Sequence, residues 1–170
     1  EIDLLESLFA EIGIRPNFKE IHLGGGTPSH LENDQLERLV NKLGGIADLN
    51  SLFEFAMEID PRTTTRDNLK FYSTLGINRI SFGVQDFDHD VQEVINRVQP
   101  FEMVEDLLSP DVRALFEGFN FDLLYGLPRQ TRQTFENTVD LVKKLAPERI
   151  TLIKYAHAPE LRNHMRMIDS

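Results

Sequence analysis

The chain has 170 residues, a formal net charge of −10 at pH 7 and no cysteine. The acidic balance argues against nucleic acid or an anionic membrane surface as a partner, although a local basic cluster can still hold a small anion. Without cysteine, the sequence supplies neither disulfides nor thiolate metal ligands. No run of about 18 apolar residues is present, so no membrane span is predicted. The length fits one domain over residues 1–170 with a single core.

The beginning of the chain predicts a helix. Apolar residues recur at helical spacing from Ile2 to Ile12, and no signal-peptide pattern precedes them. The first residue is Glu1 rather than Met. We therefore interpret the sequence as a piece of a longer protein.

Five short apolar-rich segments predict strands, because each alternates or clusters apolar residues and ends at a turn-forming residue. These predicted strands are Phe18–Leu23, Phe53–Ile59, Ile77–Val84, Phe119–Tyr125 and Ile150–Tyr155.

Segments with helical periodicity fill the intervals between these strands. Ser29 and Glu32 have the spacing of a capping box ahead of an apolar stripe over Leu36–Leu43. Asp88 is the expected N-cap of a later helix. The other predicted helices are Leu69–Leu75, closed by Gly76, Val91–Val98, Phe101–Phe116 with a break at Pro110, and Phe135–Leu145.

Strict alternation of strands and helices predicts an α/β fold with a parallel sheet. A β/α barrel and an open doubly wound sheet both fit the pattern. In either case ligands bind at the carboxyl ends of the strands.

Small or polar residues do occupy these strand ends. Three glycines follow the first predicted strand but match neither the Walker pattern nor G-x-G-x-x-G, which argues against those nucleotide sites. Asp122 lies between Phe121 and Leu123 and therefore faces the opposite side of its strand. Taken singly, each of these residues has an ordinary structural explanation: the glycines as a turn, and Glu58 and Arg97 as exposed side chains. The set of small and polar residues at the strand ends favours a ligand site. The five histidines show no metal-ligand spacing.

Several motifs occur in an order that resembles the radical S-adenosylmethionine domain of the oxygen-independent coproporphyrinogen III oxidase family. They are GGGTP at Gly24–Pro28, EIDP at Glu58–Pro61, GINRISFGVQDF at Gly76–Phe87, INRVQ at Ile95–Gln99, FDLLYGLPRQT at Phe121–Thr131 and YAHAP at Tyr155–Pro159. A related haem-chaperone branch shares GGGTP and the Gly-Leu-Pro turn but typically has Gly-Val-Gln-Ser-Phe. Asp86, the Asn96–Gln99 segment and the Tyr155–His157 segment favour the oxidase.

The resemblance implies a partial (β/α) TIM-like barrel of the radical SAM type, with parallel strands and the first strand missing. In this family the loop after the first strand carries the motif Cys-x-x-x-Cys-x-x-Cys, which binds a [4Fe-4S] cluster. That loop is missing together with the strand, so the ligands of the cluster lie outside this chain. The resemblance implies no catalytic or metal-binding residue within the chain. The residues that it implies for binding S-adenosylmethionine are Gly25, Gly26, Thr27, Glu58, Gln85, Arg97, Asp122 and Ala156.

The implied reaction is oxidative decarboxylation of two propionate side chains of coproporphyrinogen III, giving protoporphyrinogen IX in haem biosynthesis. The resemblance also implies a cytoplasmic enzyme with an electron donor protein and no nucleic acid or membrane partner. The chain alone is expected to be inactive. The cofactor carries the chemistry, so no general base is expected. Candidates for holding the substrate carboxylates are Arg79, Arg129 and Lys154.

Two other functions remain open from the sequence. One is a haem chaperone built on the same barrel, without oxidase activity. The other is an ordinary β/α-barrel hydrolase or isomerase in which Glu58 and Asp122 act as acid and base.

Overall fold

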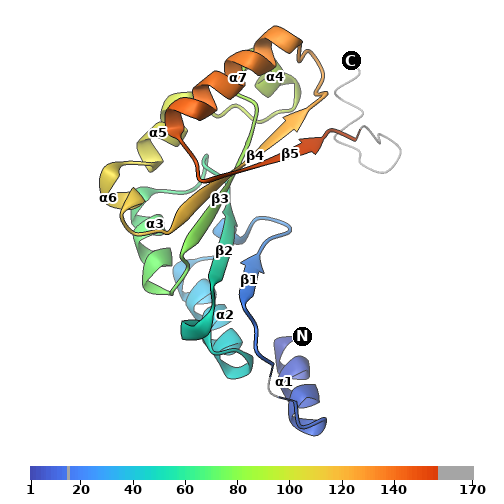
Figure 1. Ribbon diagram of the computed structural model, residues 1–170, viewed down its shortest axis with the longest axis vertical. Coiled ribbons are helices and arrows are strands. Elements are labelled where there is room, and N and C mark those ends of the chain that lie inside the picture. Colours follow the sequence, from blue (N-terminus) through green and yellow to red (C-terminus); the bar gives the residue numbers. More distant parts are fainter. Residues whose placement is uncertain (15, 157–170) are drawn as a thin grey trace.

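The computed structural model describes residues 1–14 and 16–156, which form one curved sheet with helices along it (Figure 1). The strands are β1 (Glu20–Leu23), β2 (Glu54–Ile59), β3 (Arg79–Gln85), β4 (Gly118–Tyr125) and β5 (Arg149–Lys154). The α-helices are α1 (Ile2–Glu11), α2 (Asn33–Ile46), α3 (Arg66–Thr74), α4 (His89–Val94), α5 (Phe101–Leu107), α6 (Pro110–Arg113) and α7 (Arg132–Leu145). Short 3-10 helices η1 and η2 span Pro28–His30 and Leu49–Ser51.

All four strand pairings are parallel, and the strands follow one another in the order β1-β2-β3-β4-β5. Helices α2 to α7 lie along the convex face of the sheet, and the concave face is open (Figure 1). A doubly wound sheet has helices on both faces and reverses its strand order. The structure is therefore part of a β/α barrel, as the family resemblance predicted.

The core lies between the convex face of the sheet and its helices. Phe55, Met57 and Ile59 are buried on β2, as predicted for one face of this strand, but Glu54 and Ala56 on the other face are buried as well. Phe53, which the prediction included, precedes the strand and is 71% exposed. Phe82 on β3 is completely buried, with its ring centroid 5.9 Å from that of Phe119 and 5.6 Å from that of Phe121. Burying large apolar side chains of three adjacent strands fixes the register of the sheet.

The concave face carries polar side chains, and at the amino ends of the strands they form an ion-pair cluster. Glu54 Oε2 lies 2.8 Å from Arg79 Nε and 3.0 Å from Arg149 Nη2. Burial acts to raise the pKa of Glu54, but the two guanidiniums outweigh it and hold the pKa below its ordinary value. A Cβ on Gly118 would lie 2.5 Å from Arg79 Nη1, so any larger residue there would push the Arg79 guanidinium out of its present position.

Some helix bounds differ from the sequence predictions, since α4 ends at Val94 rather than Val98 and α6 ends at Arg113. The capping box of α2 is formed by Glu32 and Gln35 rather than by Ser29 and Glu32, and α2 begins at Asn33. Ser29 lies in η1, where its hydroxyl accepts a hydrogen bond from the Asp60 backbone N–H at 3.1 Å. Ser29 therefore connects two loops instead of starting a helix.

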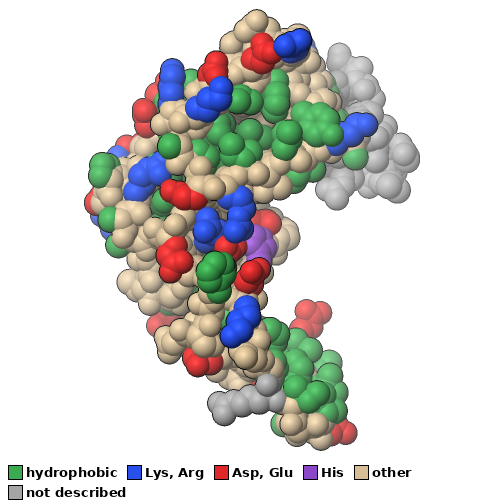
Figure 2. Space-filling view, viewed as in Figure 1, with side chains coloured by type: hydrophobic (Ala, Val, Ile, Leu, Met, Phe, Trp, Pro, Cys, Tyr) green, Lys and Arg blue, Asp and Glu red, His purple; other side chains and the backbone are tan. Residues whose placement is uncertain are grey.

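Helix α1 forms where predicted, but none of its residues is buried. Its side chains Leu4 and Leu8 are 73% and 45% exposed, and hydrophobic side chains gather over this helix at the lower end of Figure 2. In the described residues no helix combines the length and hydropathy that crossing a bilayer requires.

We expect Phe82→Ala to lower the free energy of unfolding by about 3–5 kcal/mol, because it opens a cavity within the aromatic cluster. The matched control is Phe53→Ala, whose ring is 71% exposed and whose loss should cost less than about 0.5 kcal/mol. Urea denaturation of the full-length protein measures both, and equal effects would contradict the assigned core.

Candidate functional site

A cavity of about 290 Å³ opens at the carboxyl ends of the strands on the concave face. It brings together six of the eight residues implied by the resemblance. The lining residues are Gly26, Thr27, Glu58, Ile59, Asp60, Gly83, Gln85, Arg97, Asp122 and Ile153. Figure 2 shows acidic and basic side chains side by side across the middle of the molecule.

The two remaining predicted residues do not line this cavity. Gly25 lies at its edge and donates its backbone N–H to Glu58 Oε2 at 3.3 Å. Ala156 follows β5 and is exposed. His157, part of the YAHAP motif, falls outside the described residues.

The three consecutive glycines meet two different physical requirements. A Cβ on Gly24 would lie 2.7 Å from Glu58 Oε1 and 2.8 Å from His22 Nε2, so a side chain here would displace the Glu58–His22 pair. Gly25 and Gly26 have φ values of 73° and 66°, a backbone conformation that favours glycine. Nothing lies within 4 Å of a Cβ built on either residue. The loop therefore turns sharply and leaves open space beside its backbone.

Glu58 extends from β2 into the cavity, where two neighbours hold its carboxylate. His22 Nε2 lies 3.0 Å from Glu58 Oε1, and the Gly25 N–H contacts the other oxygen. The Glu58 side chain is 43% exposed and the His22 side chain is 51% exposed. A carboxylate held in this way remains accessible to a ligand.

Asp122 faces the cavity from β4, on the side opposite Phe121 and Leu123, as predicted. Ser81 Oγ donates to Asp122 Oδ2 at 3.0 Å, and Asn120 Nδ2 donates to Asp122 Oδ1 at 2.8 Å. Thr151 Oγ1 donates to Asn120 Oδ1 at 3.1 Å. The protein itself therefore supplies one donor to each oxygen of the Asp122 carboxylate. Each oxygen retains a further lone pair for a ligand.

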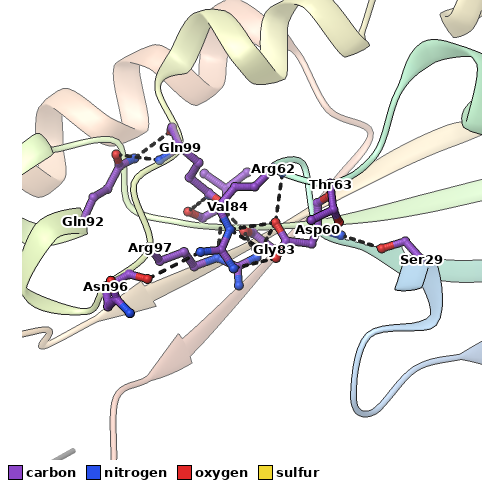
Figure 3. Close-up of polar contacts among 10 residues, drawn as sticks. All are labelled: Ser29, Asp60, Arg62, Thr63, Gly83, Val84, Gln92, Asn96, Arg97 and Gln99. Atoms are coloured by element: carbon purple, nitrogen blue, oxygen red, sulfur yellow. Dashed lines mark hydrogen bonds and ion pairs between the residues drawn. The ribbon is translucent and has the colours of Figure 1, made fainter. Parts of the chain in front are cut away.

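Arg97 reaches the cavity from the segment after α4 and shares a buried carboxylate with Arg62 (Figure 3). Arg62 Nη2 lies 2.6 Å from Asp60 Oδ2, and Arg97 Nη2 lies 3.7 Å from Asp60 Oδ1. Burial acts to raise the pKa of Asp60, but the Arg62 hydrogen bonds and the Arg97 charge hold it below its ordinary value. Burial lowers the pKa of Arg97, although the Asp60 charge opposes this.

Sequence reasoning missed Asp60 as a member of the site. Asp60 is the third residue of the EIDP motif, and an Asp before a proline is explained equally well by a turn. In the structure the Asp60 side chain is 5% exposed and balances part of the charge of two arginines. His22 was missed for a similar reason, since one histidine on a strand carries no specific signal.

Asp86, which the sequence analysis did not place in the site, is completely buried behind it. Its carboxylate accepts hydrogen bonds from Gln130 Nε2 at 2.6 Å and from the Asp88 N–H at 2.8 Å. Thr138 Oγ1 also donates to it. Asp86 thereby joins the loop after β3 to the loop after β4 and to α7.

The three candidates for holding substrate carboxylates do not line the cavity. Arg79 lies at the amino end of β3 and pairs with Glu54, away from the cavity. Ile153 lines the cavity, so Lys154 points to the opposite face of β5. Arg129 is exposed in the loop after β4, with a φ of 61°.

Comparison with known proteins identifies the family. The profile of the Radical SAM superfamily matches residues 1–142. The chain belongs to the radical SAM superfamily.

Similar proteins from this superfamily point to one enzyme group. The chain is 40% identical over 151 residues to an oxygen-independent coproporphyrinogen III oxidase from Helicobacter pylori, covering 88% of this chain and 33% of the relative. Its identity to the Bradyrhizobium diazoefficiens enzyme of that name is 41% over 164 residues, covering 96% of this chain and 36% of the relative. The chain thus spans about one third of the length of these curated relatives.

A solved structure shares the fold over nearly the whole chain. The radical SAM enzyme coproporphyrinogen III oxidase from Escherichia coli matches with a TM-score of 0.87 and 34% identity. The match covers 98% of this chain and 38% of that chain. The radical SAM fold predicted from the motifs is therefore confirmed.

The part of the chain that the structure describes shows no metal centre. The sequence has no cysteine, so a thiolate-bound cluster finds no ligand within it. Among residues 1–14 and 16–156, no group of three or more His, Asp or Glu side chains is arranged to hold a metal ion.

We expect Asp60→Asn to lower the free energy of unfolding at pH 7 by about 1–3 kcal/mol, because two arginines lose their shared carboxylate. The pKa of Asp60 is lowered in the folded state, so its stabilisation is present above its ordinary value of 3.8. It is lost as the pH falls through the lower folded-state value.

Urea denaturation of the full-length protein between neutral and acidic pH measures this dependence. The difference between wild type and Asp60→Asn should shrink as the solution becomes more acidic than about pH 4. Asp34→Asn, an exposed position in the first turn of α2, is the control and should change stability by less than about 1 kcal/mol. A difference for Asp60→Asn that stays constant across this range would contradict the ion-pair assignment.

Proposed function

We propose that this chain forms the S-adenosylmethionine-binding part of an oxygen-independent coproporphyrinogen III oxidase. In this reaction two propionate side chains of coproporphyrinogen III lose CO₂ and become vinyl groups, giving protoporphyrinogen IX. The observation that carries the proposal is the gathering of Gly26, Thr27, Glu58, Gln85, Arg97 and Asp122 around one cavity. Relatives with about 40% identity that bear this enzyme's name support it.

The charges around the cavity suit S-adenosylmethionine. This ligand carries a sulfonium, an ammonium, a carboxylate, ribose hydroxyls and an adenine. Within residues 1–14 and 16–156, Glu58 and Asp122 have no Lys or Arg ion-pair partner, so their carboxylates suit the cationic groups or the hydroxyls. Two arginines share the Asp60 carboxylate, which leaves positive charge on the opposite side for an anionic group. The cavity volume, about 290 Å³, is near the lower end of small-molecule pockets.

The proposed contacts follow from the donors and acceptors present. Gly25, Gly26 and Thr27 offer backbone groups at a loop with open space beside it. Gln85 offers an amide and Arg97 a guanidinium for the polar groups of the ligand. Ala156 contributes backbone at the end of β5, outside the cavity as described.

When bound, S-adenosylmethionine and a reduced [4Fe-4S] cluster supply the radical that removes hydrogen from the substrate propionate. The residues of this chain bind and orient the cofactor and limit access of water at the concave face. The cluster's thiolates must come from outside this sequence, since it lacks cysteine. We further propose a cytoplasmic enzyme that receives electrons from a donor protein.

No observation favours the two alternatives over this function. Membership of the radical SAM superfamily weighs against an acid–base mechanism at Glu58 and Asp122. The haem-chaperone alternative shares the superfamily, so an experiment must separate it from the oxidase.

The function is tested with the full-length protein, purified anaerobically with its cluster reconstituted. We expect conversion of coproporphyrinogen III to protoporphyrinogen IX that requires both S-adenosylmethionine and a reductant, followed by porphyrin fluorescence after oxidation. Omitting S-adenosylmethionine is the control. Stoichiometric haem binding without conversion would favour the chaperone, and conversion without S-adenosylmethionine would contradict radical chemistry.

We expect Asp122→Ala in the same protein to weaken S-adenosylmethionine binding by about 1–3 kcal/mol, because a polar partner of the ligand is lost inside the cavity. Calorimetry measures the affinity, and Asp140→Ala on the surface of α7 is the matched control. Unchanged affinity in Asp122→Ala would remove Asp122 from the proposed contacts.

A further inference from the structure

We propose that Gln99 is a positioning residue that aims both Gln85 and Arg97 at the cavity. This inference rests on the proposed function, because it concerns how two proposed cofactor-binding side chains are held. Gln99 itself does not line the cavity, and its side chain is completely buried. It belongs to the INRVQ motif, in which the proposed function uses only Arg97.

Every polar atom of the Gln99 side chain has a partner in the site (Figure 3). Its Nε2 donates to the Gly83 carbonyl at 3.0 Å and also to the Val84 carbonyl. Its Oε1 accepts a hydrogen bond from Arg97 Nε at 3.2 Å. One buried amide thus contacts the end of β3 and the Arg97 guanidinium at the same time.

The backbone that Gln99 contacts is irregular at this point. Gly83 pairs with Asp122 and Gln85 pairs with Leu123, so Val84 is an extra residue in β3 and forms a β-bulge. Gln85 then has a φ of 67°, which is uncommon for a residue with a side chain. A bulge beside a site changes the direction of the following side chain. By holding both carbonyls before Gln85, Gln99 fixes this direction.

Gln85 and Arg97 converge on one point above Gly83. A Cβ on Gly83 would lie 2.9 Å from Arg97 Nη2 and 3.0 Å from Gln85 Nε2. Arg97 Nη2 also donates to the Gly83 carbonyl at 3.0 Å. The two side chains therefore share one support, and a shift in the bulge moves both.

Gln92 on α4 holds Gln99 in place from behind. Its Nε2 donates to the Gln99 carbonyl at 2.8 Å, and its Oε1 accepts from the Gln99 N–H at 3.1 Å. The Gln92 carbonyl accepts from the Arg97 N–H at 2.8 Å. Gln92 is 2% exposed, so the segment between these residues is fixed against a buried support.

These contacts predict that Gln99 and Arg97 are energetically coupled in binding the cofactor. If Gln99 aims Arg97 as well as Gln85, removing its amide weakens binding much less once Arg97 is absent, because only the part of the effect that passes through Gln85 remains. A residue that merely stabilises the fold would have the same effect with or without Arg97.

A double-mutant cycle in the full-length, cluster-reconstituted protein tests this. S-adenosylmethionine affinity is measured by equilibrium dialysis for wild type, Gln99→Met, Arg97→Met and the double variant. We expect Gln99→Met to weaken binding about 10-fold, since misplaced binding groups lose their contacts. In the Arg97→Met background the same change should weaken binding by less than about 3-fold.

Gln133→Met is the matched control, because this exposed glutamine of α7 donates a hydrogen bond to the neighbouring Asn137 side chain and does not line the cavity. Thermal unfolding is followed for every variant. If Gln99→Met does not fold, the cycle uses Gln92→Met, which removes the support of Gln99 without touching the cavity.

Two failures are distinguishable. Wild-type protein that does not bind S-adenosylmethionine would overturn the proposed function. Wild-type binding together with unchanged affinity in the Gln99 or Gln92 variant, or with equal losses in both backgrounds, would overturn the positioning role alone.

Discussion

The structure depends on one constraint, the alternation of side chains across a curved parallel sheet. Along β2, β3 and β4 every second residue is large and apolar and is buried beneath the helices. The residues between them must face the concave side, where Glu58, Gly83 and Asp122 line the cavity. Burying one face therefore decides the composition of the other, because a shift by one residue would expose the core and bury the charges.

The polar groups at the carboxyl ends are held by a further set of buried polar residues. Asp60 balances two arginines, Asp86 joins two loops to α7, and Gln99 supports a bulge together with a guanidinium. Buried polar groups are costly unless they are hydrogen-bonded, and those of these three side chains are paired. Such a network gives long, flexible side chains defined directions on an open concave surface.

Local patterns predicted the elements well, and the misses have physical causes. Strand positions and the cap at Asp88 followed from alternation and from a side chain that bonds its own helix. Ser29 was misplaced because its hydroxyl accepts from the distant Asp60 instead. Charge alone does not indicate position along a strand, and Arg79 lies at the amino ends of the strands, away from the cavity. Lys154 also lies outside the cavity lining, because the pleat of β5 turns its neighbour Ile153 toward the cavity.

The sequence by itself determined the parallel β/α architecture, the radical SAM family and most of the residues around the cavity. These features depend on local periodicity and on the order of motifs, both of which can be observed directly in the sequence. Only the tertiary structure decided that Gln99 meets the bulge in β3, that Asp60 serves two arginines and that His22 contacts Glu58. These contacts join residues on different elements, and their partners are set by how the strands align and curve, which no local pattern encodes.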